Sequence, residues 1–200
     1  VEYVEIRALD VNAFEPNGVN VDQLRFMEAF VIFCLLEKSP LITESEQKTI
    51  QYNELTVALR GREPGLHLQL KGAAIPLKTW AAEILDGVEA VCIALDSGQP
   101  QPLFKRALRH QRDALEDFQL LPSAQMITAM EDTGLPFAKY AFALSEQHEE
   151  YFRSRQLEDV KASKLRMLAT ESIQSQADIE ASDDIDLEEF LRRYFNEELG

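Results

Sequence analysis

Apolar residues recur at helical spacing over most of this 200-residue sequence, and this periodicity constrains the fold more than any other feature. Over the last two thirds of the chain it predicts helices at residues 77–95, 102–118, 123–132, 136–155, 157–179 and 186–199. Two earlier helices are predicted at 22–38, which Asp22 can cap, and at 43–59, where Thr43 and Glu46 have the spacing of a capping box. The sequence therefore predicts a mainly α fold.

The core should come from the apolar faces of these helices. On the helix predicted at 22–38, the stripe at helical spacing consists of Leu24, Phe26, Met27, Phe30, Val31, Cys34 and Leu35. Trp80, Phe137 and Tyr140 also fall at helical spacing, so we interpret them as core residues and not as a platform for a ligand.

Residues 1–10 follow a different pattern, in which side chains alternate between two faces. Val4, Ile6 and Ala8 fall on one face, and Tyr3, Glu5, Arg7 and Leu9 fall on the other. This alternation predicts an N-terminal β-strand. Because the first residues already read as the middle of a strand, we expect the sequence to be part of a longer chain. Residues 66–70 also alternate and predict a second, short strand.

Composition excludes several classes of protein. A hydrophobic fraction of 46% with 28% charged residues is typical of a globular domain. The net charge of -15 argues against a nucleic acid as the main partner, because phosphate binding needs clustered positive charge. No apolar run is long enough to span a membrane. Cys34 and Cys92 lie in separate apolar runs, so we expect free, buried thiols in a cytoplasmic protein.

Glu5 and Arg7 are the strongest candidates for chemistry. Two residues apart on a strand, they project from the same face, about 7 Å apart by the strand rise. A carboxylate can hold a divalent cation through oxygen, and a guanidinium can fork onto phosphate or carboxylate. Judged by spacing alone, a surface ion pair is the commoner arrangement for two such residues.

Three consecutive motifs near the start of the sequence resemble one family, the proteobacterial glutamate–cysteine ligases. They are the run EYVEIRALDVNAF, a Pro-Asn-Gly-Val turn and the helical run VDQLRFMEAFVIFCLL. The resemblance continues more loosely through GREPGL (61–66), AMEDTG (129–134) and the helix that holds residues 137–151. It implies the C-terminal portion of an α+β ligase with a glutamine-synthetase-like sheet.

That resemblance also implies a reaction. These enzymes join the γ-carboxylate of L-glutamate to the amine of L-cysteine with ATP and Mg²⁺, the first step of glutathione biosynthesis. By resemblance, Glu5 is a magnesium ligand, and Arg7 is a catalytic residue that also binds the phosphates of ATP. The remaining site residues of the family precede this segment. We therefore expect the N-terminal portion of the same enzyme as a partner, and the isolated 200 residues to be inactive.

Three regions are expected along the chain: a catalytic-sheet strand with its loop at 1–20, a helical region packing on the sheet at 21–156, and an acidic helical tail at 157–200. The tail supports an alternative function, a non-catalytic helical module that binds another protein. Its apolar stripe consists of Leu187, Phe190, Leu191, Tyr194 and Phe195. In this alternative, Glu5 and Arg7 are only a surface pair.

Other polar residues rank lower as site candidates. His67 and His148 have no companions at metal-binding spacing, so we interpret them as packed or surface residues. Arg62 in GREPGL has no assigned role. A basic patch on the helix predicted at 102–118 consists of Lys105, Arg106, Arg109, His110 and Arg112. We expect it to be a solvated face, paired with Asp113, Glu116 and Asp117 of the same helix.

Overall fold

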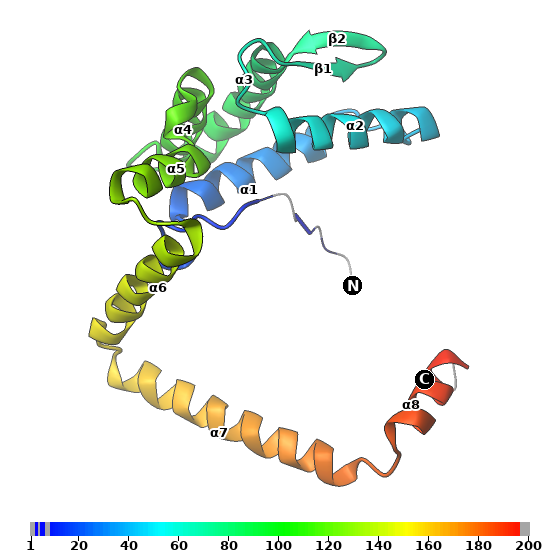
Figure 1. Ribbon diagram of the computed structural model, residues 1–200, viewed down its shortest axis with the longest axis vertical. Coiled ribbons are helices and arrows are strands. Elements are labelled where there is room, and N and C mark those ends of the chain that lie inside the picture. The colour runs from blue at the N-terminus through cyan, green and yellow to red at the C-terminus, as the bar shows by residue number, and fades with distance from the viewer. Residues whose placement is uncertain (1–2, 4, 7–8, 197–200) are drawn as a thin grey trace. The chain divides into compact units, whose positions relative to one another are not determined.

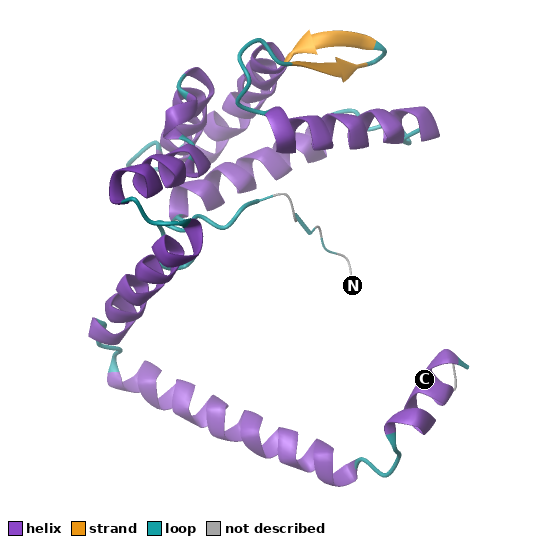
Figure 2. Cartoon of the chain, viewed as in Figure 1, coloured by secondary structure: helices purple, strands orange, loops and turns teal. Residues whose placement is uncertain are grey.

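The computed structural model describes residues 3, 5–6 and 9–196. Over these residues the chain is mainly helical, with one short antiparallel hairpin (Figures 1 and 2). The predicted mainly α fold class is therefore confirmed. The chain divides into two compact units, Val1–Tyr151 and Phe152–Gly200. Within the described residues, every helix is too short or too polar to cross a membrane.

The helices of the structure follow the predicted ones closely. From the N-terminus they are α1 (Val21–Leu36), α2 (Glu44–Arg60), α3 (Leu77–Asp96), α4 (Leu103–Glu116), α5 (Pro122–Thr133), α6 (Phe137–Ser154), α7 (Asp159–Ser182) and α8 (Leu187–Phe195). A 3-10 turn, η1 (Phe118–Leu120), follows α4, which ends two residues before the predicted end at residue 118.

The core of the first unit lies where α1, α3 and α4 pack against one another. Its buried residues are Ala29, Leu85, Val88, Val91, Cys92 and Leu108. Burial raises the pKa of the Cys92 thiol, so this cysteine is an inert packing residue, as expected. Cys34 is exposed, which corrects the expectation that both thiols are buried.

The apolar stripe predicted on α1 is partly wrong. Leu24 is 55% exposed and Leu35 is 80% exposed. Phe26 and Phe30 contact the core as predicted, together with Ala29, Ile32 and Phe33, which were not in the predicted stripe. Apolar residues surround this helix on nearly every side, so periodicity alone does not select the buried face.

The cap of α1 is also different from the predicted one. Asn20 is the N-cap, and its side chain accepts a hydrogen bond from the backbone N–H of Gln23. The Gln23 side chain accepts from the backbone N–H of Asn20 in return, which completes a capping box. Asp22 lies within the first turn, because the helix begins at Val21. For α2, the prediction is confirmed: Thr43 caps it and accepts from the N–H of Glu46.

The predicted strand at 66–70 is present as β1 (His67–Leu70), paired with β2 (Ala73–Pro76), which periodicity did not reveal. Both turn residues, Lys71 and Gly72, have positive φ, as two-residue hairpin turns require. Asn53 of α2 fixes the hairpin, donating to the carbonyl of Gln69 at 2.7 Å and accepting from its N–H at 2.9 Å.

The start of α4 is capped by a residue from the preceding helix. The Asp96 carboxylate, at the end of α3, accepts from the backbone N–H of Phe104 at 3.0 Å and of Lys105 at 2.9 Å. The residue at the cap position of α4 is Pro102, whose side chain makes no capping bond. Asp96 therefore satisfies two N–H groups that the helix itself cannot pair.

The strand predicted at residues 1–10 stays a prediction. Residues 3, 5–6 and 9–10 have no strand conformation, and residues 1, 2, 4, 7 and 8 lie outside the described residues. A strand is defined by the ladder that it forms with a partner, and the one ladder in the described part of the chain joins β1 and β2. The expected three-part division at residues 20 and 156 also stays a prediction.

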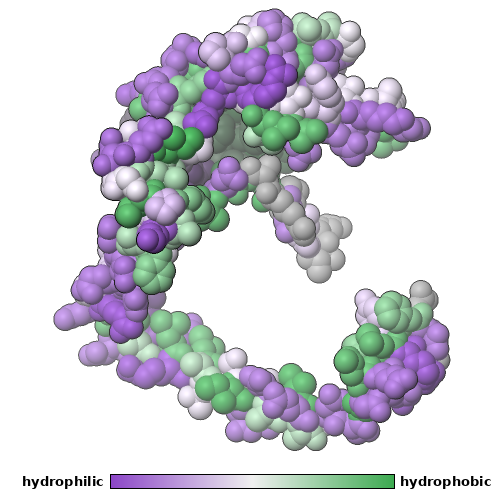
Figure 3. Space-filling model, in the orientation of Figure 1, coloured by the Kyte–Doolittle hydropathy of each residue, from purple (hydrophilic) through white to green (hydrophobic). Residues whose placement is uncertain are grey.

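The second unit has little core of its own. None of the described residues of α7 and α8 is buried. The apolar residues of α8 lie at its surface (Figure 3), and Leu187 and Phe195 are 72% and 76% exposed. The predicted helices are confirmed, while the surface that their apolar residues would cover stays a prediction.

Candidate functional site

The two predicted site residues have different outcomes. Glu5 is described, and it is exposed in a stretch without regular secondary structure. Arg7 lies outside the described residues. The predicted pairing of Glu5 with Arg7 on one face of a strand therefore stays a prediction.

The loop after this stretch is closed by its own hydrogen bonds. The backbone N–H of Asn12 donates to the carbonyl of Gly18 at 2.8 Å, and the N–H of Gly18 donates to the carbonyl of Glu15 at 2.8 Å. The Asn12 side chain accepts from the N–H of Phe14 at 3.1 Å. Asn20 donates to the Glu15 carboxylate at 3.2 Å, which ties the loop to the start of α1. The loop is therefore held closed by its own polar groups.

Asp22 joins α1 to α4 through an ion pair. The guanidinium of Arg106 contacts both carboxylate oxygens of Asp22, at 2.7 Å through Nη2 and 3.1 Å through Nε. Arg25 adds a bond at 3.1 Å, and Nδ1 of His110 lies 3.6 Å from the same carboxylate. The expected pairing of the basic patch within its own helix is wrong here, because the nearest carboxylate to Arg106 is on α1.

A second residue of the basic patch also pairs across helices. Nη2 of Arg112 lies 2.8 Å from Asp86 and 3.1 Å from Glu89, both on α3. The patch faces the neighbouring helices on this side, so part of it acts as a bridge in the helical packing and not as a solvated face. Arg106 and Arg112 are thus engaged in helix packing, whereas Lys105 and Arg109 are exposed.

The Asp22 ion pair makes stability depend on pH. The hydrogen bond from Arg106 holds the pKa of the Asp22 carboxyl below its ordinary value of 3.8, against the opposing effect of burial, with further lowering from Arg25 and His110. The unfolded chain then binds a proton more readily than the folded chain. The stabilisation is complete above pH 3.8 and is lost as the pH falls through the lower pKa of the folded state.

We therefore expect Asp22→Asn to lower the thermal unfolding midpoint at neutral pH, and the gap from the parent chain to shrink as the pH falls below 3.8. Circular dichroism melts on both sides of this pH measure the gap. Asp184→Asn is the control, since Asp184 is exposed and makes no ion pair with any described residue. If the difference in unfolding midpoint between Asp22→Asn and the parent chain stays the same below pH 3.8, the ion pair is not its source.

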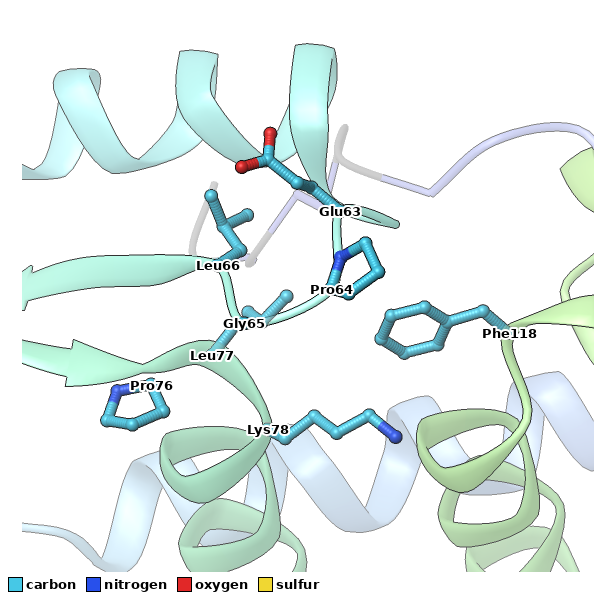
Figure 4. A pocket seen from close by; sticks show the side chains of 8 residues that line it. All are labelled: Glu63, Pro64, Gly65, Leu66, Pro76, Leu77, Lys78 and Phe118. Carbon is cyan, nitrogen blue, oxygen red and sulfur yellow. The ribbon is translucent and has the colours of Figure 1, made fainter.

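A hollow of about 250 Å³ lies between the GREPGL loop and the start of α3 (Figure 4). Its lining is mostly apolar, and Phe118 points toward Pro64 and Lys78. The Lys78 ammonium lies 5.0 Å from the centre of the Phe118 ring and donates to the carbonyl of Glu116 at 3.2 Å. Arg62 is exposed and does not line this hollow. The GREPGL loop thus forms one wall of this hollow, and the structure assigns no role to Arg62.

A larger and more polar hollow of about 500 Å³ opens beside the closed loop. It is lined from three directions: by the loop with the first turn of α1, by α4, and by the segment from η1 to α5. Its polar lining includes Asn12, Asn20, Gln23 and His110, together with the paired Asp22. The loop and the start of α1 therefore line a polar hollow, and they are the described part of the candidate region for function.

The lower-ranked residues behave mostly as interpreted. His67 is exposed and its Nδ1 donates to the carbonyl of Gly65 at 2.7 Å, and His148 is half-buried on α6. Among the described residues, no group of three or more His, Cys, Asp or Glu side chains is arranged to hold a metal ion. Trp80 and Tyr140 are half-buried, but Phe137 is 60% exposed, so its assignment to the core is wrong.

Comparison with known proteins tests the resemblance directly. The sequence model of the glutamate–cysteine ligase family matches residues 1–57. A glutamate–cysteine ligase of Pseudomonas fluorescens Pf0-1 is 36% identical over 194 residues, and one of Pseudomonas aeruginosa UCBPP-PA14 is 36% identical over 200 residues. These matches cover 97% and 100% of this chain. This chain is similar over nearly its whole length to glutamate–cysteine ligases.

The likeness to this family extends to the fold. A crystal structure of the glutamate–cysteine ligase of Francisella tularensis, in complex with AMP, matches with a TM-score of 0.82 and 29% identity over 95% of this chain. The chain spans 36% and 38% of the two Pseudomonas relatives and 37% of the Francisella chain. It therefore corresponds to a little over a third of a glutamate–cysteine ligase.

Proposed function

We propose that this chain is part of a cytoplasmic, ATP-dependent ligase that joins L-glutamate through its γ-carboxylate to the amine of L-cysteine, the first step of glutathione biosynthesis. The observation that carries the proposal is the match, over nearly the whole chain, to an AMP-bound ligase of this family. A bound adenine nucleotide in that relative supports a nucleotide substrate for the family.

The proposed reaction has two steps. The γ-carboxylate of glutamate attacks the terminal phosphorus of ATP, giving an acyl phosphate and ADP. The amine of cysteine then attacks the acyl carbon, phosphate leaves, and the amine loses a proton as the amide forms. Arg7 would bind the transferring phosphoryl group, because a guanidinium forks onto its oxygens and offsets the charge that develops there.

Glu5 would hold Mg²⁺, which neutralises phosphate charge when it is bound. An exposed carboxylate offers the hard oxygen that this ion prefers, so the residue fits the role. Octahedral magnesium needs more ligands than one carboxylate provides, and no other acidic or histidine cluster among the described residues supplies them. We therefore place the remaining ligands in the part of the ligase that this chain does not match.

The exposed apolar surface supports a partner of this kind. Along α2, Tyr52, Leu55 and Leu59 are 55%, 60% and 74% exposed, and large exposed apolar patches mark interaction sites. We propose that the rest of the ligase, the expected N-terminal portion, covers this face. The alternative of a separate binding module has less support, because the match to the Pseudomonas aeruginosa ligase includes the tail as well as the body.

The test uses a joined ligase, defined as the Pseudomonas aeruginosa relative with the stretch that matches this chain replaced by these 200 residues. We expect the joined ligase to form γ-glutamylcysteine when glutamate, cysteine, ATP and Mg²⁺ are all present, and the 200 residues alone to form none. Mass spectrometry of the product and release of phosphate measure the reaction. Product from the 200 residues alone, or a joined ligase that folds by circular dichroism but is inactive, would contradict the proposal.

A further inference from the structure

The attachment of the Glu5 stretch to the body begins at one buried residue. The described residues before Asn12 are all exposed, including Tyr3 at 72% and Val11 at 79%. Asn12 itself is 8% exposed. Whatever position Glu5 takes in the assembled site, the chain reaches it from this anchored point.

The anchor is a set of five residues that we name the loop clamp: Asn12, Glu15, Gly18, Asn20 and Gln23. Gln23 is its centre, because its Oε1 atom accepts from the backbone N–H of Asn20 at 2.9 Å and lies 3.5 Å from the side-chain nitrogen of Asn12. Its backbone N–H donates to the Asn20 side chain at 2.8 Å. The loop clamp thus joins the buried end of the Glu5 stretch to the first turn of α1.

The first turn of α1 is in turn fixed to the core. Asp22, next to Gln23, makes the two-pronged ion pair with Arg106 of α4. Ala29 and Phe30 of the same helix pack into the cluster formed with α3 and α4. A continuous series of contacts therefore runs from the helical core, through Gln23, to Asn12.

We propose that the loop clamp positions Glu5, with Gln23 and Asn12 as positioning residues that fix the anchored point from which the chain leads to Glu5. This inference rests on the proposed function. Catalysis by positioning is sensitive to small displacements. A distant mutation that misplaces the reacting groups by about 1 Å can lower the rate by about 10²-fold. Because the loop clamp would act by positioning Glu5 and not by touching substrate or metal, its loss should affect turnover more than substrate binding.

The test compares Gln23→Ala with Gln23→Glu in the joined ligase. The Gln23 side chain accepts from Asn20 and Asn12 through Oε1, and a carboxylate keeps that acceptor, so Gln23→Glu should restore the clamp. We expect Gln23→Ala to lower kcat by about 10- to 10²-fold with little change in KM for cysteine, and Gln23→Glu to remain near the parent. A Gln23→Glu enzyme as slow as Gln23→Ala would overturn the proposal.

Thr43→Ala is the matched control, because it removes the N-cap bond of α2 as Gln23→Ala disrupts the capping box of α1. Both should lower the unfolding midpoint, but Thr43→Ala should leave kcat unchanged. Equal loss of kcat in the two variants would assign the effect to stability and overturn the positioning role.

A second pair keeps the proposal testable if Gln23→Ala fails to fold. Gly18 has φ +72° and a Cβ there would lie 3.0 Å from Val11, whereas Gly98 has φ +77° with open space around it. We expect Gly18→Ala to lower kcat and Gly98→Ala not to, although both strain the backbone. Equal kcat values for Gly18→Ala and Gly98→Ala would contradict the positioning role of the loop clamp and leave the proposed function standing. A folded, inactive parent would overturn the proposed function and this inference with it.

Discussion

We expect the replacement of Arg7 with methionine to lower kcat of the joined ligase by about 10²- to 10³-fold, the usual effect of removing one donor that stabilises charge in a transition state. Methionine keeps an unbranched side chain but removes every N–H donor and the positive charge. Because the guanidinium would act mainly on the transferring phosphoryl group, the loss should appear in kcat more than in KM for glutamate. Steady-state kinetics with each substrate varied in turn separate the two.

The control for this result is Arg166→Met, the same substitution at an exposed position on α7. It should leave kcat within a factor of about two, since surface changes away from a site have small effects. An Arg7→Met enzyme that keeps the activity of the control would show that Arg7 is only a surface residue, as in the alternative that Glu5 and Arg7 form a simple ion pair.

Leu108→Ala should lower the free energy of unfolding of the first unit by about 2–5 kcal/mol. Leu108 is 3% exposed and belongs to the cluster in which α1, α3 and α4 meet. Truncation leaves a cavity that three rigid helices cannot easily close. Urea titration followed by tryptophan fluorescence measures the effect, because Trp80 on α3 is the only tryptophan of the chain and therefore reports on this unit.

Leu168→Ala is the companion measurement. Leu168 lies on α7 and is 46% exposed, so the same truncation should change stability by no more than about 0.5 kcal/mol. Equal losses in the two variants, or a loss below about 1 kcal/mol for Leu108→Ala, would contradict the assignment of the core to the junction of α1, α3 and α4.

Helix positions were predictable from the sequence because the apolar periodicity and the capping residues indicate the same boundaries. Thr43 with Glu46 marks the start of α2 where the structure has it. β2 was not predictable, because Ala73–Pro76 has little strand propensity and gains its conformation from pairing with β1. The buried face of α1 was hidden for a related reason: the packing of α3 and α4 selects it, and the helix is apolar on other sides as well.

The candidate site was predictable only as residue types. Glu5 and Arg7 are visible as a charged pair on an alternating segment, but no local pattern shows which ligands complete the site. The loop clamp was missed although its signal was present: Asn20 and Gln23 have the spacing of a capping box. Asp22 was predicted as the cap because it too precedes the apolar run. Its ion pair with Arg106 was not predictable, because sequence spacing does not reveal that α4 lies beside α1.

The Asp96 carboxylate has a consequence for the order in which the chain folds. The first turn of α4 lacks a cap of its own and depends on an acceptor from the last residue of α3. Nucleation is the costly step in forming a helix, and here the group that offsets it becomes available only when the end of α3 is in place. The two helices should therefore form as one cooperative hairpin, and amide exchange at Phe104 and Lys105 should follow the opening of α3.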